Sequence, residues 1–363
     1  MRMKRTGVAD LPLHPGRAPR WLFERMVKLG RAISEILILE YGRDEFLRRL
    51  SDPFWFQAFS CVLGFDWHSS GTTTVTCGAL KEAINLSEYG ISVAGGKGSV
   101  SRKTPDEIKK FGEILSLSDS RIDSLIYSSR MAAKVDNSAI QDGYNLYHHV
   151  FIFSEDGKSV VIQQGMNEKN RYARRYHWLS EDVKSFVNEP HSGIAGYERK
   201  EKVLNMVAGE SEECRKTCVD IVKENPKKLV NWFRRISYQK TLDGEEILSM
   251  PMSINWSLMK KMYDFQPTNY EELLSIRGVG PKTVRSLALI ADLIYGSKPS
   301  WRDPIKFTFT VGGKDGVPYP VDRKVMDETI DILANSIKDA RIGDREKMKA
   351  LKRLRVLIPE GIR

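Results

Sequence analysis

Apolar residues recur at helical spacing along most of the chain, whereas a few short stretches have the composition of strands. Residues 17–60 are basic and partly apolar, as expected of helices. Residues 144–153 and 159–164 are rich in β-branched and aromatic residues, and residues 155–158 between them have the composition of a turn. This pattern predicts a β-hairpin. A shorter β-prone run is expected at residues 72–76.

The pattern changes near residue 190 and then becomes mainly helical. Residues 188–196 contain Pro and Gly and are the best candidate for a linker. We therefore expect a mixed α/β domain at residues 1–190 and a helical domain at residues 198–363. A β-hairpin is expected to be inserted near residues 305–320, where apolar and polar residues alternate before a glycine-rich turn. The predicted fold class is α+β.

The strongest local signal is a Gly-x-Gly-Pro turn between two predicted helices. Gly278 and Gly280 bracket a turn that favours positive φ, and Pro281 suits the first position of the second helix. Thr268 and Glu271 have the spacing of a capping box that begins the first helix. The turn thus directs backbone N–H groups and the positive end of a helix at one point, which suits a phosphate.

This turn resembles the helix-hairpin-helix motif of DNA-binding proteins, and the resemblance rests on residues 278–283. It implies contact with the phosphates of DNA without reading of the base sequence. The residues expected to contact DNA here are Arg277, Gly278, Val279, Gly280, Lys282, Thr283 and Arg285. The alternative is an ordinary tight turn between two helices.

The same segment resembles DNA glycosylases of the endonuclease III type, which pair a hairpin Lys with an Asp in a later Val-Asp segment. The matching positions are Lys282 and Asp322. The resemblance implies that the amine of Lys282 attacks the sugar C1′ of a flipped nucleotide and forms a Schiff base, while Asp322 stabilises the cationic transition state. The alternatives are a phosphate contact for Lys282 and a helix N-cap for Asp322.

The charge balance also favours a polyanionic partner. The formal net charge is +10, and both ends of the chain hold more Lys and Arg than Asp and Glu. Solvated helix faces would give the same excess. We find no apolar run long enough to span a bilayer and no signal-peptide pattern, so a cytoplasmic location is expected. Four cysteines fit a reducing compartment, and they are expected to be core residues.

Two basic stretches in the N-terminal half are further candidates for DNA contact. Residues 90–103 are predicted to form a glycine-rich loop that binds an anion, and residues 171–178 interleave arginine with aromatic residues, as in backbone contact with base stacking. The basic residues concerned are Lys97, Arg102, Lys103, Arg171, Arg174 and Arg175. The alternatives are a flexible surface loop and an amphipathic helix with buried aromatic residues.

Carboxylates and imidazoles in the N-terminal half would suffice for a metal site. The candidate ligands are Asp66, His68, Asp136 and Asp142. Such a site would hold Mg²⁺ or Mn²⁺ and activate water for cleavage of DNA. The alternative is that the aspartates are turn residues and the histidine is structural. No cofactor is expected outside this nuclease hypothesis.

Nearly the whole chain resembles an uncharacterised prokaryotic family, found in archaea and bacteria. The resemblance is carried by residues 66–71, 94–98, 101–105, 140–144, 163–166 and 303–304. It implies no activity.

We therefore predict a DNA-binding protein of DNA repair or processing. Three hypotheses stay open: a DNA glycosylase or abasic-site lyase, a metal-dependent nuclease that uses the hairpin as a clamp, and a non-catalytic binder of DNA structure. The expected partner is DNA, contacted through its phosphates without strong sequence specificity, and no membrane partner is expected.

Overall fold

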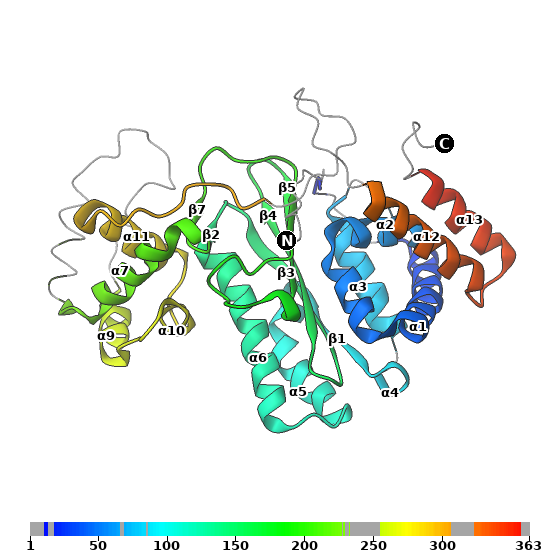
Figure 1. Ribbon diagram of the computed structural model, residues 1–363, viewed down its shortest axis with the longest axis horizontal. Coiled ribbons are helices and arrows are strands. Elements are labelled where there is room, and N and C mark those ends of the chain that lie inside the picture. The colour runs from blue at the N-terminus through cyan, green and yellow to red at the C-terminus, as the bar shows by residue number, and fades with distance from the viewer. Residues whose placement is uncertain are drawn as a thin grey trace.

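The protein is described by a computed structural model over residues 11–13, 18–65, 69–84, 86–226, 228, 232, 255–305 and 323–356. A five-stranded sheet crosses the middle of the molecule, and helices cover both of its faces (Figure 1). This mixture of an antiparallel sheet with segregated helices confirms the predicted α+β class.

The sheet has the strand order β1-β3-β4-β5-β6, and each neighbouring pair is antiparallel. Its strands are β1 (Ile91–Lys97), β3 (Asn145–Ser154), β4 (Ser159–Asn167), β5 (Tyr172–Leu179) and β6 (Gly193–Gly196). β3 and β4 confirm the predicted β-hairpin. A second, two-stranded ladder pairs β2 (Ile140–Gln141) with β7 (Leu204–Asn205).

The two faces of the sheet belong to two different buried clusters. Val150 and Ile152 of β3 lie in one cluster, whereas Phe151 and Phe153 lie in the other. This follows from the period of two in a strand, which sends successive side chains to opposite faces. Because both faces are covered, polar residues in the middle strands are buried as well.

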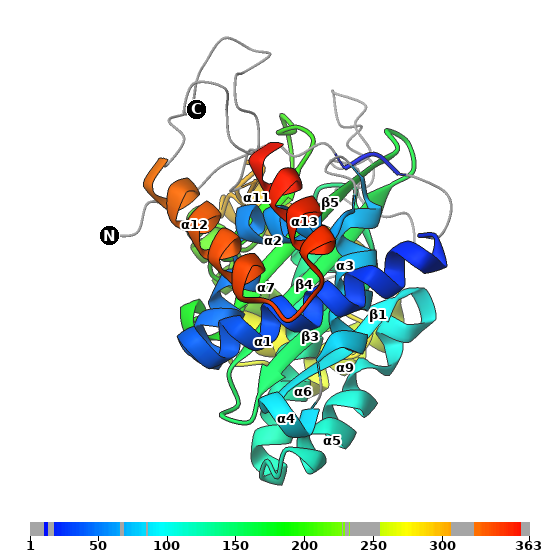
Figure 2. The same ribbon diagram turned by 90° about the vertical axis from the view of Figure 1, so that its right-hand side faces the viewer.

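Helices from both ends of the chain cover the Val150 face. They are α1 (Arg20–Ser51), α2 (Pro53–Leu63), α3 (Gly71–Ala83), α12 (Arg323–Asp339) and α13 (Asp344–Val356). α12 packs on α1 and α13 packs on α2, so the last helices return to the first (Figure 2). α1 and α2 confirm the helices predicted within residues 17–60. The short α4 (Leu86–Tyr89) leads into β1.

The Phe151 face is covered by α5 (Thr104–Ile114) and α6 (Asp119–Lys134). Beside them lies a second group of helices: α7 (Glu212–Lys223), α9 (Trp256–Phe265), α10 (Tyr270–Ser275) and α11 (Pro281–Tyr295). One continuous buried cluster joins this group to the sheet. Short helical turns complete the described chain: η1 (Gly98–Lys103), the π-helical η2 (Val135–Ala139), η3 (Ser180–Asp182) and η4 (Gly209–Ser211).

Three local predictions are wrong. Residues 72–76 lie inside helix α3, where Thr72, Thr73 and Thr76 are buried against neighbouring elements. Residues 90–103 form β1 and η1 instead of a loop. The stretch expected as a linker contains β6, which pairs with β5. In each case tertiary packing overrides the local composition.

The predicted division into two domains stays a prediction. The two buried clusters both cross it, since one joins the sheet to α7, α9, α10 and α11 and the other joins α12 and α13 to α1, α2 and α3. The β-hairpin expected near residues 305–320 lies outside the described residues except for Ile305, which is buried.

The four cysteines are free thiols, as expected of core residues. Cys77, Cys214 and Cys218 are buried, and Cys61 is partly buried. Burial raises the pKa of Cys77 to about 12. Across the part of the chain that is described, none of the helices combines the length and the apolar character needed to cross a bilayer.

Candidate nucleic-acid interface

The first helix of the predicted pair begins at a well-formed cap. Asn269, not Thr268, is the N-cap of α10, and its side chain accepts a hydrogen bond from the N–H of Glu272 at 2.9 Å. Glu272 in turn accepts from the N–H of Thr268 at 2.7 Å, which holds the pKa of this carboxyl below its ordinary value. The helix is therefore capped at Asn269, one residue later than predicted, and Glu272 in place of Glu271 accepts a backbone N–H, from the residue before the cap.

The turn that follows needs glycine at one of its two glycine positions. Gly278 has φ of +108°, and a Cβ there would lie 3.1 Å from Cδ1 of Leu258. Gly280 has φ of −137°, and an added Cβ would meet only the carbonyl oxygen of Gly278 at 4.0 Å. Gly278 thus fixes the backbone, whereas Gly280 leaves the approach to α11 open. Gly296 ends α11 in the left-handed conformation, which glycine adopts without strain.

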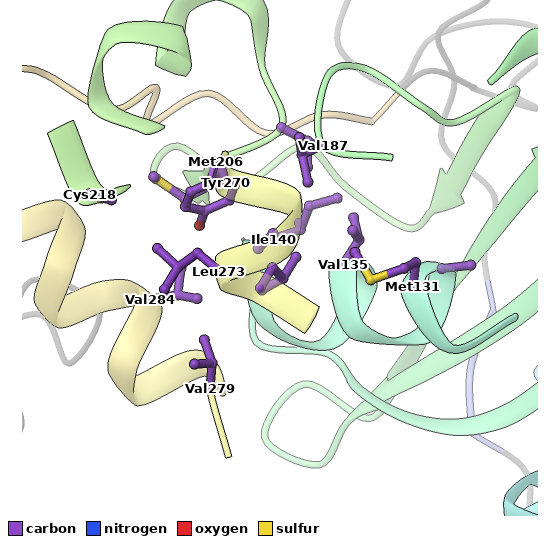
Figure 3. Close-up of a cluster of buried hydrophobic side chains, with 14 of the residues drawn as sticks. Met131, Val135, Ile140, Val187, Met206, Cys218, Tyr270, Leu273, Val279 and Val284 are labelled. Atoms are coloured by element: carbon purple, nitrogen blue, oxygen red, sulfur yellow. The ribbon is translucent and has the colours of Figure 1, made fainter. Parts of the chain in front are cut away.

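The apolar side of the hairpin faces the interior. Leu273, Val279 and Val284 lie toward Ile140 in the same buried cluster (Figure 3). Val279 is 2% exposed and its N–H donates to the carbonyl oxygen of Ile276 at 3.1 Å, so Val279 anchors the turn and offers no free donor to a phosphate. The hairpin is therefore seated on the main core of the protein.

Polar contacts fix the hairpin in the same place. The side chain of Gln141 donates to the carbonyl oxygen of Pro281 at 2.7 Å and accepts from Nε of Arg285 at 2.9 Å. The hydroxyl of Tyr127 on α6 donates to Glu271 at 2.6 Å. Arg285, expected to contact DNA, is half-buried and holds the hairpin to β2.

The outer surface of the turn carries the remaining expected contacts. Arg277 and Lys282 are exposed, and among the described residues neither has a carboxylate partner. The N–H groups of Gly280, Lys282 and Thr283 have no hydrogen-bond partner in that same part of the chain, because the first bond of α11 runs from Val284 to Gly280. These amides and the two cations lie at the positive end of α11 and can receive an anion.

The other exposed candidates lie on different elements. Lys97 ends β1 with its ammonium group 5.8 Å from the ring centre of Tyr147, and Arg102 and Lys103 lie on η1. Arg171 occupies the turn before β5 with φ of +59°. All four are at the surface, where phosphate contact is sterically open.

Arg174 and Arg175 are not available to DNA, which corrects the prediction for both. They are successive residues of β5, point to opposite faces of the sheet, and are 0% exposed. Arg174 donates to Asp142 at 2.9 Å and to both oxygens of Asp303 at 2.8–2.9 Å. Burial disfavours the charged guanidinium, but the two carboxylates outweigh it and raise the pKa of Arg174.

Arg175 has different partners on the opposite face. Its guanidinium donates to Gln57 at 3.0 Å, to Thr73 at 3.3 Å and to the carbonyl oxygen of Pro53 at 3.2 Å. Its Nε also lies 2.9 Å from Nε2 of His177. Burial without a carboxylate among these partners lowers the pKa of Arg175 to about 9.

Asp142 is a structural counter-ion instead of a metal ligand. One of its oxygens accepts from Arg174 and, at 2.6 Å, from the hydroxyl of Tyr176, and the other accepts from the N–H of Tyr144 at 3.0 Å. Burial raises the pKa of Asp142, while Arg174 opposes this shift. Both carboxylate oxygens are therefore already engaged.

Asp136 lies in a separate buried network. Its oxygens accept from Gln163 at 2.6 Å, from the indole of Trp178 at 3.0 Å and from His191 at 2.5 Å. Because Gln163 directs its amide N–H at Asp136, its carbonyl oxygen accepts from Nδ1 of His149 at 2.9 Å. Nε2 of His149 then accepts from Ser129 at 2.8 Å.

The predicted metal site is not assembled by these residues. Asp136 and Asp142 are held in two different networks, and no group of three or more His, Cys, Asp or Glu suited to a metal occurs among the described residues. Asp66 and His68 lie outside those residues. Asp322 also lies outside them, so the separation of Lys282 from Asp322 is not given by the structure.

One cavity of about 310 Å³ lies beside the β2–β7 ladder. His191, Asn205 and Asp303 contribute to its wall, whereas Lys282 does not. Sequence reasoning missed His191 and Ser129, which belong with Gln163 and His149 to the hydrogen-bond network around Asp136. No local pattern predicts this network, because its residues come from separate segments that only the fold brings together.

Comparison with known proteins identifies a family but no activity. The family described as a protein of unknown function, DUF763, matches residues 7–321, and the chain belongs to it. Neither the curated proteins nor the solved structures give a significant match.

Proposed function

We propose that this member of the DUF763 family binds the sugar–phosphate backbone of DNA through the turn between α10 and α11. The observation that carries the proposal is the combination of open amides at Gly280, Lys282 and Thr283 with the exposed cations Arg277 and Lys282. Three N–H groups without a partner among the described residues, at a helix N-terminus flanked by two cations, are suited to a phosphate. The net charge of +10 favours the same class of partner.

Binding of this kind does not read bases. The groups offered are backbone amides and flexible cations, which recognise phosphate oxygens and carry no pattern that distinguishes base pairs. We therefore propose a role in DNA repair or processing that depends on DNA structure, in the cytoplasm. The four free cysteines are compatible with that location.

A binding titration with a matched control tests this proposal. Lys282→Gln removes a cation from the turn, and Lys216→Gln removes an exposed cation of α7 that is paired with Glu212 and Glu213. The expected result is that Lys282→Gln lowers the salt dependence of duplex binding by about one phosphate contact, a change of about 0.9 in the slope of log K against log salt. Lys216→Gln should leave the slope unchanged. Equal slopes for all three proteins would exclude the turn as the DNA contact.

Abasic-site lyase chemistry at Lys282 is a second candidate function. Lys282 is exposed on the first turn of α11, beside the proposed phosphate site, where its amine can reach a sugar. In this reaction the amine nitrogen forms a bond to C1′ of the open-chain sugar, water leaves, and an imine results. Asp322 remains the proposed partner of Lys282 from the resemblance to glycosylases.

Borohydride trapping distinguishes this chemistry from binding. Reduction of the imine should join the protein covalently to abasic-site DNA in the presence of chelator, and the adduct should map to Lys282. Lys282→Arg keeps the positive charge but cannot form the imine, so it should bind DNA without forming an adduct. An adduct of undiminished yield in Lys282→Arg would remove Lys282 as the nucleophile.

The geometry disfavours the metal-dependent nuclease at two of its four proposed ligands. Asp136 and Asp142 each accept hydrogen bonds from three protein donors, which leaves little capacity for Mg²⁺ or Mn²⁺. If DNA is bound but is not altered with or without these metals, and no borohydride adduct forms, the non-catalytic binder is the function that remains.

A further inference from the structure

Two lysines from separate helices lie against the hairpin turn. Lys134 ends α6, and its ammonium group donates to the carbonyl oxygen of Ile276 at 3.1 Å. Lys261, from α9, donates to the carbonyl oxygen of Arg277 at 3.2 Å. Ile276 and Arg277 are consecutive residues of the turn, so the two ammonium groups bind neighbouring carbonyl oxygens of the same piece of backbone.

These lysines complete a group of cations without counter-ions. Lys134, Lys261, Arg277 and Lys282 surround one turn, and within the described ranges none of them forms an ion pair with a carboxylate. Many other cations of the chain do: Lys158 pairs with Asp44 and Glu181, for example. We call these four residues the turn cations.

The crowding has an electrostatic cost. Partial burial lowers the pKa of Lys134, and the charge of Lys261 lowers it further. The two carbonyl oxygens supply hydrogen bonds but no net negative charge, so the repulsion between the lysines is not neutralised by the protein. A polyanion laid across the turn would neutralise it.

We propose that Lys134 and Lys261 bind DNA phosphates, so that the contact surface continues from the turn onto α6 and α9. This inference rests on the proposed function. It makes the ligand a run of phosphates along a DNA strand instead of a single phosphate at the start of α11. It also explains why the hairpin is fixed to α6 through Tyr127, since cations from both elements must keep one spacing to match one strand.

The test measures the salt dependence of duplex binding for charge-removing and charge-keeping variants. Lys134→Gln and Lys261→Gln should each make the slope of log K against log salt shallower by about 0.9. Between 50 and 200 mM salt, the factor by which the binding constant falls should therefore be about 3.5-fold smaller for each variant than for the unaltered protein. Lys134→Arg and Lys261→Arg should keep the slope of the unaltered protein, and Lys216→Gln is the control for an exposed, paired lysine.

The outcomes separate this inference from the proposed function. Unchanged slopes in both Gln variants, together with a shallower slope in Lys282→Gln, would overturn the extended surface and leave the turn as the DNA contact. No binding by the unaltered protein would overturn both. Melting temperatures of all variants check folding, and Lys261 is exposed, so its substitution keeps the test decisive if Lys134→Gln is destabilised.

Discussion

Replacing Asp136 distinguishes a structural carboxylate from a metal ligand. Asp136→Ala leaves three buried donors, on Gln163, Trp178 and His191, without their acceptor. A buried donor without a partner costs about 1–3 kcal/mol, so the three donors together amount to about 3–5 kcal/mol if part of the loss is relieved by rearrangement. Since His191 and Trp178 are almost fully buried, water cannot replace Asp136 without rearrangement. We expect a loss of about 3–5 kcal/mol in the free energy of unfolding.

Urea unfolding followed by circular dichroism measures this loss. The midpoint should fall while the slope m stays constant, and Asp136→Asn should lose less because it keeps one acceptor oxygen. Asp156→Ala, at an exposed turn, is the control and should change stability by no more than about 0.5 kcal/mol. Chelator should not change the midpoint of the unaltered protein. A loss below about 1 kcal/mol in Asp136→Ala, or a chelator-sensitive midpoint that this variant abolishes, would refute the reasoning.

Two further predictions concern the turn and a buried histidine. Gly278→Ala should destabilise the protein by about 1–2 kcal/mol because φ is +108° there. Gly280→Ala should fold normally but weaken DNA binding, because its methyl group would obstruct the approach to α11. Thermal melting and binding titrations check both variants, and equal stability of the two would contradict the different roles given to these glycines. Burial, and to a smaller extent the neighbouring His149 and Lys97, lowers the pKa of His148 from 6.5 to about 3, so the unfolded chain binds a proton in this window that the folded chain does not. Stability should therefore be retained above pH 6.5 and fall as the pH drops toward 3. His148→Leu should flatten this loss because it removes the titrating ring. The fold should tolerate leucine, since neither ring nitrogen of His148 has a hydrogen-bond partner among the described residues. An unchanged acid limb in His148→Leu, measured by urea unfolding across this range, would contradict it.

The sequence alone predicted the local structure where the backbone conformation requires a particular type of residue. The turn around Gly278 was predictable because only glycine adopts its φ readily, and Pro281 marks the start of α11. The β3–β4 hairpin was predictable from its β-branched strands and polar turn. In both cases the information lies within about ten residues of the chain.

The buried arginines of β5 could not be predicted in the same way. A stretch with Arg174 and Arg175 reads as exposed, because isolated charges rarely enter a core. The counter-ions of Arg174 are Asp142 and Asp303, which lie far from it in sequence and approach it only in the fold. The same holds for the network around Asp136. The composition of this stretch does not indicate that both faces of β5 are covered by other elements.

The prediction of a strand at residues 72–76 was wrong for a related reason. Its threonines favour strands when considered alone, but in α3 their hydroxyls find partners in the interior: Thr76 donates to Ser60 at 2.7 Å, and Thr73 bonds to Gln164. Packing against neighbouring helices and the sheet therefore decides the local structure.

The central claim is that the protein binds DNA through backbone phosphates, without reading sequence. Its most direct test is equilibrium binding of two fluorescent duplexes of equal length and unrelated sequence, measured by anisotropy over a series of salt concentrations. We predict equal affinity for the two duplexes and a linear fall of log K with log salt, with a slope of about −0.9 for each phosphate contacted. No binding at the lowest salt concentration, or an affinity that does not change with salt, would contradict the account.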